Sequence, residues 1–157
     1  MSSTTNLETG SYYIQSVATG KYIGRHWAED RSLLPKKVIQ RPEDWEPTPW
    51  KVVKQDDGTY TLTIGGGPTG AINSKLFAIL LDVPPPEHWK IFSPERNEED
   101  EFVIMDKREE KGWIVPDSED YTQIVVHNLI IGPSDPPFFP ANEVFKFTPA
   151  KDDVAEE

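Results

Sequence analysis

The sequence of 157 residues contains no cysteine, so disulfides, thiol nucleophiles and cysteine-ligated zinc are all excluded. This absence favours a reducing compartment, and we expect a cytoplasmic protein. The first residues have neither the basic nor the apolar segment of a secretory signal peptide, which agrees with that expectation. No apolar run approaches the roughly 20 residues of a membrane-spanning helix, so we expect no membrane partner.

Basic residues are also scarce: 16 Lys and Arg stand against 27 Asp and Glu, which gives a formal net charge of −11. Nucleic acids and anionic membranes bind basic patches, so neither is an expected partner. The acidic residues concentrate at positions 95–101 and in the last residues of the chain. We interpret them as a solvated turn and as a disordered acidic tail over 151–157.

The groups that usually carry catalysis are sparse. The only histidines, His26, His88 and His127, lack the spacing of metal ligands. No carboxylate stands in an apolar setting, and the glycines at 65–67 lack the Gly-Lys-Ser/Thr ending of a phosphate-binding loop. We therefore expect no enzyme, no cofactor and no metal.

One short pattern occurs three times, and each copy alternates an aromatic residue, a lysine and an apolar residue. This period of two is typical of a strand with one buried face. It places each lysine on the other face of the strand from the aromatic side chain. Fifteen prolines and ten glycines favour turns over helices. The copies are Trp50-Lys51-Val52-Val53, Trp89-Lys90-Ile91-Phe92 and Phe145-Lys146-Phe147-Thr148.

Alternating runs also open each copy, at Tyr12, Tyr60 and Phe102. We divide the chain, one domain over 1–157, into repeats of about four strands at 8–54, 58–96 and 100–150. Such a chain is all-β, and its arrangement resembles a β-trefoil, a six-stranded barrel capped by three hairpins. The predicted core consists of Tyr12, Trp50, Tyr60, Trp89, Phe102 and Phe145.

Within the repeats we predict a turn over 65–70, a buried apolar run over 76–81, and strands over 112–115 and 123–126. Sugar-binding trefoils usually carry a Gln-x-Trp element in each repeat, and no such element is present. Trp27, Trp45 and Trp113 can still stack on a sugar if they are exposed. The plainer interpretation is that they pack loops onto the barrel.

Four stretches resemble the mushroom serine protease inhibitors related to cospin and cnispin, and the likeness extends over nearly the whole chain. This resemblance implies a disulfide-free β-trefoil, acting as a monomer, that inhibits trypsin-like serine proteases. A defensive role of the fungal type, or control of an endogenous protease, follows from the same likeness. The stretches are Glu29 to Lys36, Pro68 to Ile72, Lys111 to Pro116 and Ile130 to Pro140.

The family implies substrate mimicry, in which a surface loop lies in the protease cleft and its P1 side chain fills the specificity pocket. One loop that the family uses corresponds to residues 25–36, from Arg25 to Lys36, and contains Arg31-Ser32. An Arg suits the acidic pocket of trypsin, and Pro35 favours an extended residue before it. We predict Arg31 as P1, flanked by Glu29, Asp30, Ser32 and Leu33.

Two alternatives to this assignment stay open. Arg31 can instead form an ion pair with Glu29 or Asp30 and only hold the loop, and a neighbour then carries the P1 role. A second candidate loop contains His127, Asn128 and Leu129, where trypsin-inhibiting relatives have Lys or Arg, so this loop suits a protease of other specificity. The alternative functions are a β-trefoil lectin and an inhibitor of another class, such as cysteine proteases.

Overall fold

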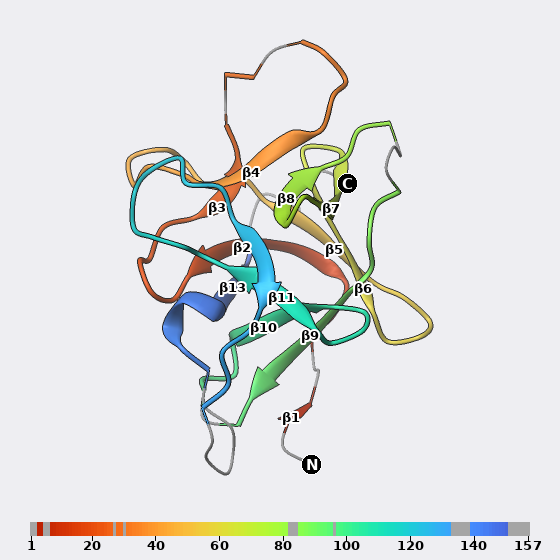
Figure 1. The fold of residues 1–157 in the computed structure, drawn as a ribbon, viewed down its shortest axis with the longest axis vertical. Coiled ribbons are helices and arrows are strands. Elements are labelled where there is room, and N and C mark those ends of the chain that lie inside the picture. Colours follow the sequence, from red (N-terminus) through yellow and green to blue (C-terminus); the bar gives the residue numbers. More distant parts are fainter. Residues whose placement is uncertain are drawn as a thin grey trace.

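The computed structural model describes residues 3–4, 7–26, 28–29, 31–81, 85–95, 97–132 and 139–150. These residues form thirteen strands, all paired antiparallel, and one short 3-10 helix, η1 (Ala141–Glu143) (Figure 1). The predicted all-β class is therefore confirmed. In this part of the chain no helix has the length and apolar character needed to cross a membrane.

Six strands form a closed ring in which each strand pairs with a neighbour on both sides. The ring closes where the end of the second repeat meets the start of the third, with Val103 opposite Phe92 and Asp106 opposite Trp89. A closed ring leaves no free edge among these strands. In ring order they are β2 (Gly10–Ser16), β5 (Trp50–Lys54), β6 (Tyr60–Ile64), β9 (Trp89–Pro94), β10 (Glu101–Asp106) and β13 (Phe145–Pro149).

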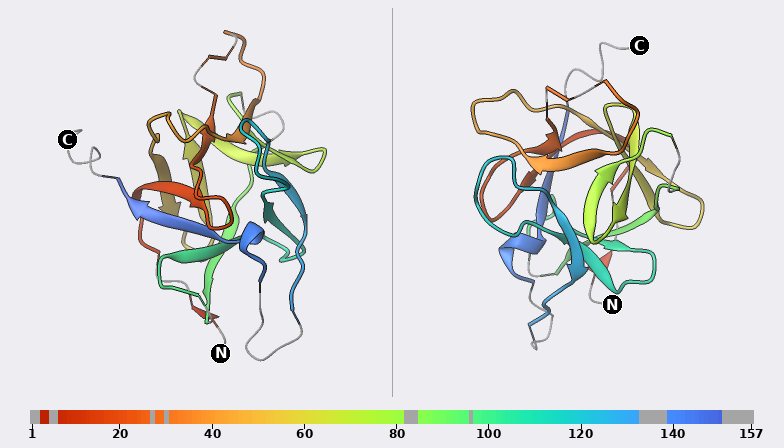
Figure 2. Two further views of the ribbon diagram at one scale, coloured as in Figure 1. Left: turned by 90° about the vertical axis from the view of Figure 1, so that its left-hand side faces the viewer. Right: turned by 45° about the horizontal axis from the view of Figure 1, so that its top comes forward.

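Three further strand pairs lie at one end of the ring (Figure 2). The central strands of this end also pair with one another, Lys36 opposite Ala78 and Val125 opposite Lys75. β1 (Ser3–Thr4) pairs separately with β9. The pairs are β3 (Ile23–Arg25) with β4 (Lys36–Gln40), β7 (Gly67–Ile72) with β8 (Lys75–Ala78), and β11 (Lys111–Ile114) with β12 (Val125–Asn128).

Each repeat thus contributes two strands to the ring and one hairpin to its end. The first and last strands of each repeat face each other through an aromatic pair: Tyr12 opposite Trp50, Tyr60 opposite Trp89, and Phe102 opposite Phe145. Aromatic cross-strand pairs stabilise antiparallel sheets. The sequence pattern therefore identified the first and last strands of each repeat, which pair with each other in the ring.

The core follows the predicted alternation. Five of the six predicted core aromatics are buried, while Tyr12 is half-buried and its hydroxyl donates to the carbonyl of Glu8 at 2.7 Å. Outside the ring, Lys51 and Lys146 are exposed, as the period of two requires. Lys90 is half-buried and pairs with Glu109 at 2.6 Å.

The side chain of Trp113 is fully buried, which agrees with the interpretation that it serves packing rather than sugar binding. Its ring lies 5.7 Å from Trp50, 5.5 Å from Trp89 and 6.0 Å from Phe145. The hairpins cover one end of the ring, and the large side chain of Trp113 fills the core there. A four-residue strand beginning with Lys and Gly shows too little alternation to reveal which face is buried.

Three boundaries also differ from prediction. Only Gly65 and Gly66 form the expected turn, with φ of 58° and 83°, and β7 begins at Gly67. The third strand of the last repeat lies two residues later than predicted. The apolar run over 76–81 is not buried throughout, since β8 ends at Ala78 and Leu81 is 58% exposed. The acidic tail lies outside the described residues.

Trp50 and Trp113 differ in hydrogen bonding, which gives a test of the core. Trp50 Nε1 donates to the carbonyl of Ile23 at 2.8 Å, whereas Trp113 Nε1 has no acceptor among the described residues. Trp50→Phe should therefore leave a buried carbonyl unpaired and lower the free energy of unfolding by about 1–3 kcal/mol more than Trp113→Phe. Urea melts measure both, and equal losses would contradict this account. Trp50→Ala should cost about 3–5 kcal/mol.

Candidate functional site

The connection between β3 and β4 projects from the hairpin-covered end of the molecule, at the top of Figure 1. Its residues Arg31, Ser32, Leu33 and Leu34 are exposed, and the two leucines show 57% and 67% of their surface. An exposed pair of large apolar side chains beside a basic one is unusual on a strongly acidic protein. The predicted P1 segment is thus accessible to a partner.

A guanidinium–carboxylate pair braces the loop on the side before Arg31. Arg25 Nε and Nη2 donate to the carboxylate of Glu29 at distances down to 2.6 Å. Arg25 Nη1 also donates to two carbonyls that are distant in sequence, those of Gly65 at 2.8 Å and Ile64 at 3.3 Å. Planar, bidentate pairing of this kind fixes geometry as well as charge. Arg25 therefore ties the first-repeat loop to the β6–β7 turn of the second repeat.

Gly65 makes this contact possible. A Cβ atom at this position would lie 2.8 Å from Arg25 Nη1, and the backbone φ is +58°. Residues other than glycine rarely adopt such a φ, and their Cβ atom would displace the guanidinium. The sequence suggested only a turn here, because a contact between residues 40 positions apart has no local signature.

A second brace lies after Arg31. Lys36, the first residue of β4, is 6% exposed, and its Nζ donates to Ser32 Oγ at 3.2 Å. The same hydroxyl accepts the backbone N–H of Leu34 at 3.3 Å. The two braces lie on either side of the Arg31–Ser32 peptide bond.

Arg31 itself is exposed and makes no hydrogen bond or ion pair within the described part of the chain. Within the described residues Glu29 forms its ion pair with Arg25, and none joins it to Arg31. Asp30 lies outside the described residues, so the assignment of Asp30 stays a prediction. The Arg31 guanidinium is available for an external carboxylate.

Aromatic side chains pack beside the base of the loop. The ring of His26 lies 5.1 Å from Trp45 and 5.4 Å from Tyr121, and its Nδ1 accepts the N–H of Ala28 at 3.0 Å. Arg41 stacks over Trp45 at 5.1 Å. A hollow of about 400 Å³ lies between this cluster and the loop, lined among others by His26, Leu34, Pro35, Ile39 and Tyr121.

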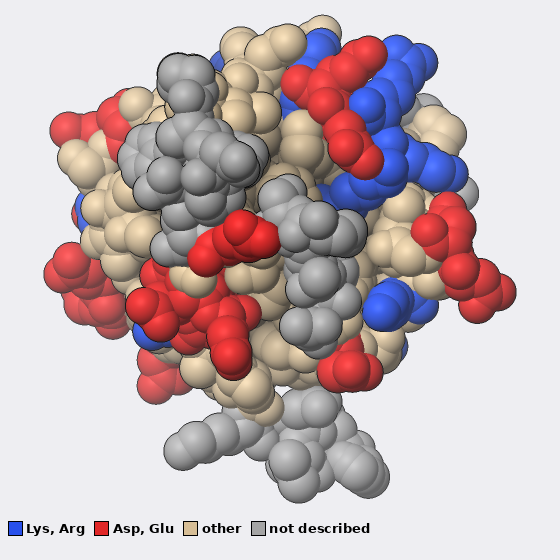
Figure 3. Space-filling model, turned by 90° about the horizontal axis from the view of Figure 1, so that it is seen from below, with Lys and Arg blue, Asp and Glu red and all other residues tan. Residues whose placement is uncertain are grey.

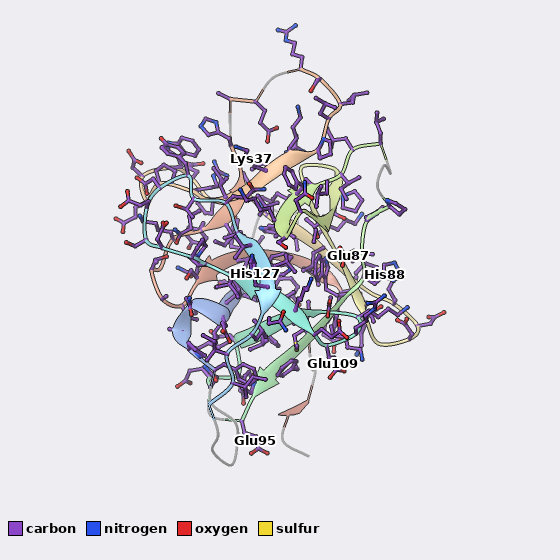
Figure 4. The ribbon with its side chains drawn as sticks, viewed as in Figure 1. Lys37, Glu87, His88, Glu95, Glu109 and His127 are labelled. Carbon is purple, nitrogen blue, oxygen red and sulfur yellow. The ribbon has the colours of Figure 1, made fainter. Side chains whose placement is uncertain are left out.

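The second candidate loop begins later than predicted. His127 and Asn128 belong to β12, where they pair with Gly112 and Lys111 (Figure 4 shows His127 on this strand). Leu129 packs against a small second cluster that includes Phe139 and Val144. A residue in a paired strand is not free to extend into a protease cleft. The residues exposed beyond them are Ile130 and Ile131, at 69% and 51%.

Glu143 in η1 forms a hydrogen bond to the segment that follows β12. The sequence analysis did not identify this residue. Its side chain is 1% exposed, and Oε2 accepts the N–H of Ile130 at 2.7 Å. Burial raises the pKa of this carboxyl above its ordinary value, while the Ile130 hydrogen bond lowers it by a smaller amount. A lone Glu after a proline-rich stretch carries no sequence signal of burial.

The face seen from below carries groups of acidic side chains and, at the upper right, a group of basic ones (Figure 3). Glu95, in the predicted acidic turn, lies at the bottom of Figure 4, whereas Lys37 lies at the loop base near the top. Among the described residues no three His, Asp or Glu side chains are placed to hold a metal ion.

Comparison with known proteins identifies the family. The model of the peptidase inhibitor I66 family matches residues 5–149. The chain belongs to this family. A protein of Lentinula edodes named serine protease inhibitor is 37% identical over 142 residues, which cover 90% of this chain and 96% of that protein. The resemblance inferred from the sequence is thereby confirmed, and these relatives are inhibitors rather than enzymes.

Solved structures agree with this assignment. A proteinase inhibitor from Coprinopsis cinerea is 38% identical and superposes with a TM-score of 0.86, covering 92% of this chain and all of that chain. A ricin B-like lectin from Macrolepiota procera, solved with lactose, has a TM-score of 0.69 at 16% identity and covers 94% of this I66 chain and all of the lectin chain. The second likeness concerns the fold alone.

Sugar binding gains no support from the tryptophans. Trp113 is buried in the core, and Trp45 is half-buried between Arg41 and the His26 ring. Trp27 lies outside the described residues. The plainer interpretation, that these side chains serve packing, holds for Trp45 and Trp113.

The Arg25 brace gives a testable consequence for loop order. Arg25→Lys keeps the charge but removes the planar fork, so amide hydrogen exchange over residues 26–35 should accelerate about tenfold. Lys90→Ala is the matched control, since it removes an exposed ion pair with Glu109 on another face. Unchanged exchange in Arg25→Lys would show that the brace does not order the loop.

Glu143 predicts a pH-dependent difference. Because burial raises the pKa of Glu143 in the folded state, its stabilising effect is present at acidic pH and is lost as pH rises through that pKa. Glu143→Gln removes this titration. The melting temperature of the variant minus that of the parent should therefore be highest near neutral pH and should decrease on acidification. The exposed Glu46→Gln is the control, and parallel profiles for all three proteins would refute the prediction.

Proposed function

We propose that this I66 protein is a β-trefoil inhibitor of trypsin-like serine proteases, with Arg31 of the 25–36 loop as its P1 residue. The observation that carries this proposal is an exposed, unpaired Arg31 on a projecting loop that is braced on both sides. A basic side chain presented in this way suits a specificity pocket with a carboxylate at its base.

The β-trefoil assignment is supported by the threefold organisation. Each repeat has four strands, of which the outer two enter the ring and the inner two form a hairpin at its end. Each repeat also contains one aromatic pair joining its first and last strands. Cross-repeat ladders then close the ring without disulfides.

The mechanism follows from the chemistry of a braced substrate. Arg31 enters the pocket, and the protease serine attacks the Arg31 carbonyl carbon, displacing the amine of Ser32 and forming an acyl-enzyme. A loop already held in position loses little conformational entropy on binding, which favours affinity. The association is therefore tight even though the peptide bond can be cut.

The two braces also keep the cleavage products in place. Arg25 and Glu29 hold the segment that ends in Arg31, while Lys36 holds the new amino terminus through Ser32 Oγ. The Ser32 amine thus stays near the acyl carbonyl and can re-form the peptide bond, releasing the serine hydroxyl. Retention gives an intramolecular reaction its high effective concentration. Cleavage is consequently reversible and slow to complete.

A monomer in the cytoplasm completes the proposal. The closed ring offers no unpaired strand for pairing between molecules, which supports a monomeric state. The absence of cysteine supports a reducing compartment. One monomer would then occupy one protease active site through one loop.

Titration of trypsin tests the central assignment. Arg31→Glu should raise the inhibition constant by on the order of 10³-fold or more, because it places a carboxylate against an acidic pocket. Arg108→Glu is the matched control, since Arg108 is an exposed arginine on the β10–β11 turn and should leave inhibition unchanged.

The clipped product gives a second readout. Prolonged incubation with trypsin at mildly acidic pH should yield a new amino terminus at Ser32. Full inhibition by Arg31→Glu would remove Arg31 from the P1 role. Absence of trypsin inhibition by the parent protein would refute trypsin-like specificity, and inhibition of papain in the same panel would assign the protein to cysteine proteases instead.

A further inference from the structure

We propose that the protease contact extends beyond the 25–36 loop to Leu81 and Tyr121, which we call the accessory pair. This inference rests on the proposed function of the loop. Leu81 belongs to the second repeat and Tyr121 to the third, so all three repeats would contribute to one protease-binding surface. The chemistry of the accessory pair fits an apolar rim beside the protease cleft.

The distribution of exposed apolar side chains supports this surface. Six large hydrophobic side chains are exposed among the described residues, and four of them are Leu33, Leu34 and the accessory pair. The other two, Ile130 and Ile131, lie on a different connection. Exposed apolar groups that gather around a projecting loop mark an interaction surface, whereas scattered ones need no explanation.

The strand register places Leu81 next to the loop. β4 and β8 are antiparallel with Lys36 opposite Ala78, so Leu33 precedes this pair by three residues and Leu81 follows it by three. The two chain segments therefore leave the ladder toward the same end of the molecule. Leu80 packs beside Gly67, which fixes the start of the segment.

Tyr121 lies beside the loop through the hollow described above. It lines this hollow together with Leu34 and Pro35, and its side chain is 51% exposed. Its backbone has a φ of +70°, which is costly for a residue with a side chain. The N–H donates to the carbonyl of Gln40 at 2.8 Å, and the ring packs on His26, so this unfavourable conformation is held by both contacts.

The usual size of a protease–inhibitor interface indicates that a protease bound to the loop also contacts the surface around it. Such complexes bury about 800 Å² on each partner. A single extended loop covers only part of that area, so the neighbouring surface must also contact the protease once Arg31 is in its pocket. Tyr121 lines the same hollow as Leu34, and Leu81 follows a strand that pairs with the end of the loop, so both can exclude water around a charged anchor.

Inhibition of trypsin by a set of variants tests the proposal. Leu81→Ala should raise the inhibition constant about fivefold and Leu81→Asp by more, mainly through faster dissociation. Tyr121→Asn, which tolerates a positive φ, should give a loss of about tenfold. Ile131→Ala is the matched control, being similarly exposed on another connection, and should bind as the parent does.

Melting curves for each variant separate loss of contact from loss of folding. Parent-like inhibition by folded Leu81→Asp and Tyr121→Asn would overturn the accessory surface while leaving the function of the loop intact. A parent protein that does not inhibit trypsin would overturn both proposals at once. An equal loss in Ile131→Ala would also count against the surface, because the effect would then not be confined to the side chains beside the loop.

Discussion

An aromatic pair across two antiparallel strands closes each repeat, and the structure depends on these three contacts. Tyr12 faces Trp50, Tyr60 faces Trp89, and Phe102 faces Phe145. Each pair joins strands that are distant in sequence, so forming it brings a whole repeat together. Ladders between successive repeats then close the ring, and Trp113 fills the core beneath the hairpins.

Closure explains how a chain without cysteine can hold the projecting 25–36 loop in place. Every ring strand has partners on both sides, and large aromatic side chains occupy the interior. The connections between strands can therefore vary without disturbing the barrel. In this chain the first repeat uses that freedom for a long loop that carries Arg31, while Glu95 lies at the other end of the molecule (Figure 4).

The parts of the fold that were predictable are those with a local pattern. Alternation placed Tyr60, Trp89 and Phe102 in the predicted core, and all three are buried. The exposed position of Arg31 also agrees with its predicted role, although its contact with a protease stays a prediction. A recurring period and a family-like loop are properties of consecutive residues, so the sequence contains them directly.

The parts that were missed depend on contacts between distant segments. Trp113 is buried against Trp50, Trp89 and Phe145 of the ring, and Glu143 is buried where it accepts the N–H of Ile130. The strand pairing of His127 is likewise fixed by β11. None of these residues differs locally from an exposed one, and a sequence read in short windows cannot separate the two cases.

The contact between Arg25 and the turn at Gly65 has a consequence for reusing the loop. Half of its anchorage, the carbonyls of Ile64 and Gly65, belongs to another repeat. A segment of residues 25–36 transplanted alone onto a different barrel would keep its sequence and lose this support. The transferable unit is therefore the loop together with a distant glycine turn, because the loop geometry depends on both segments.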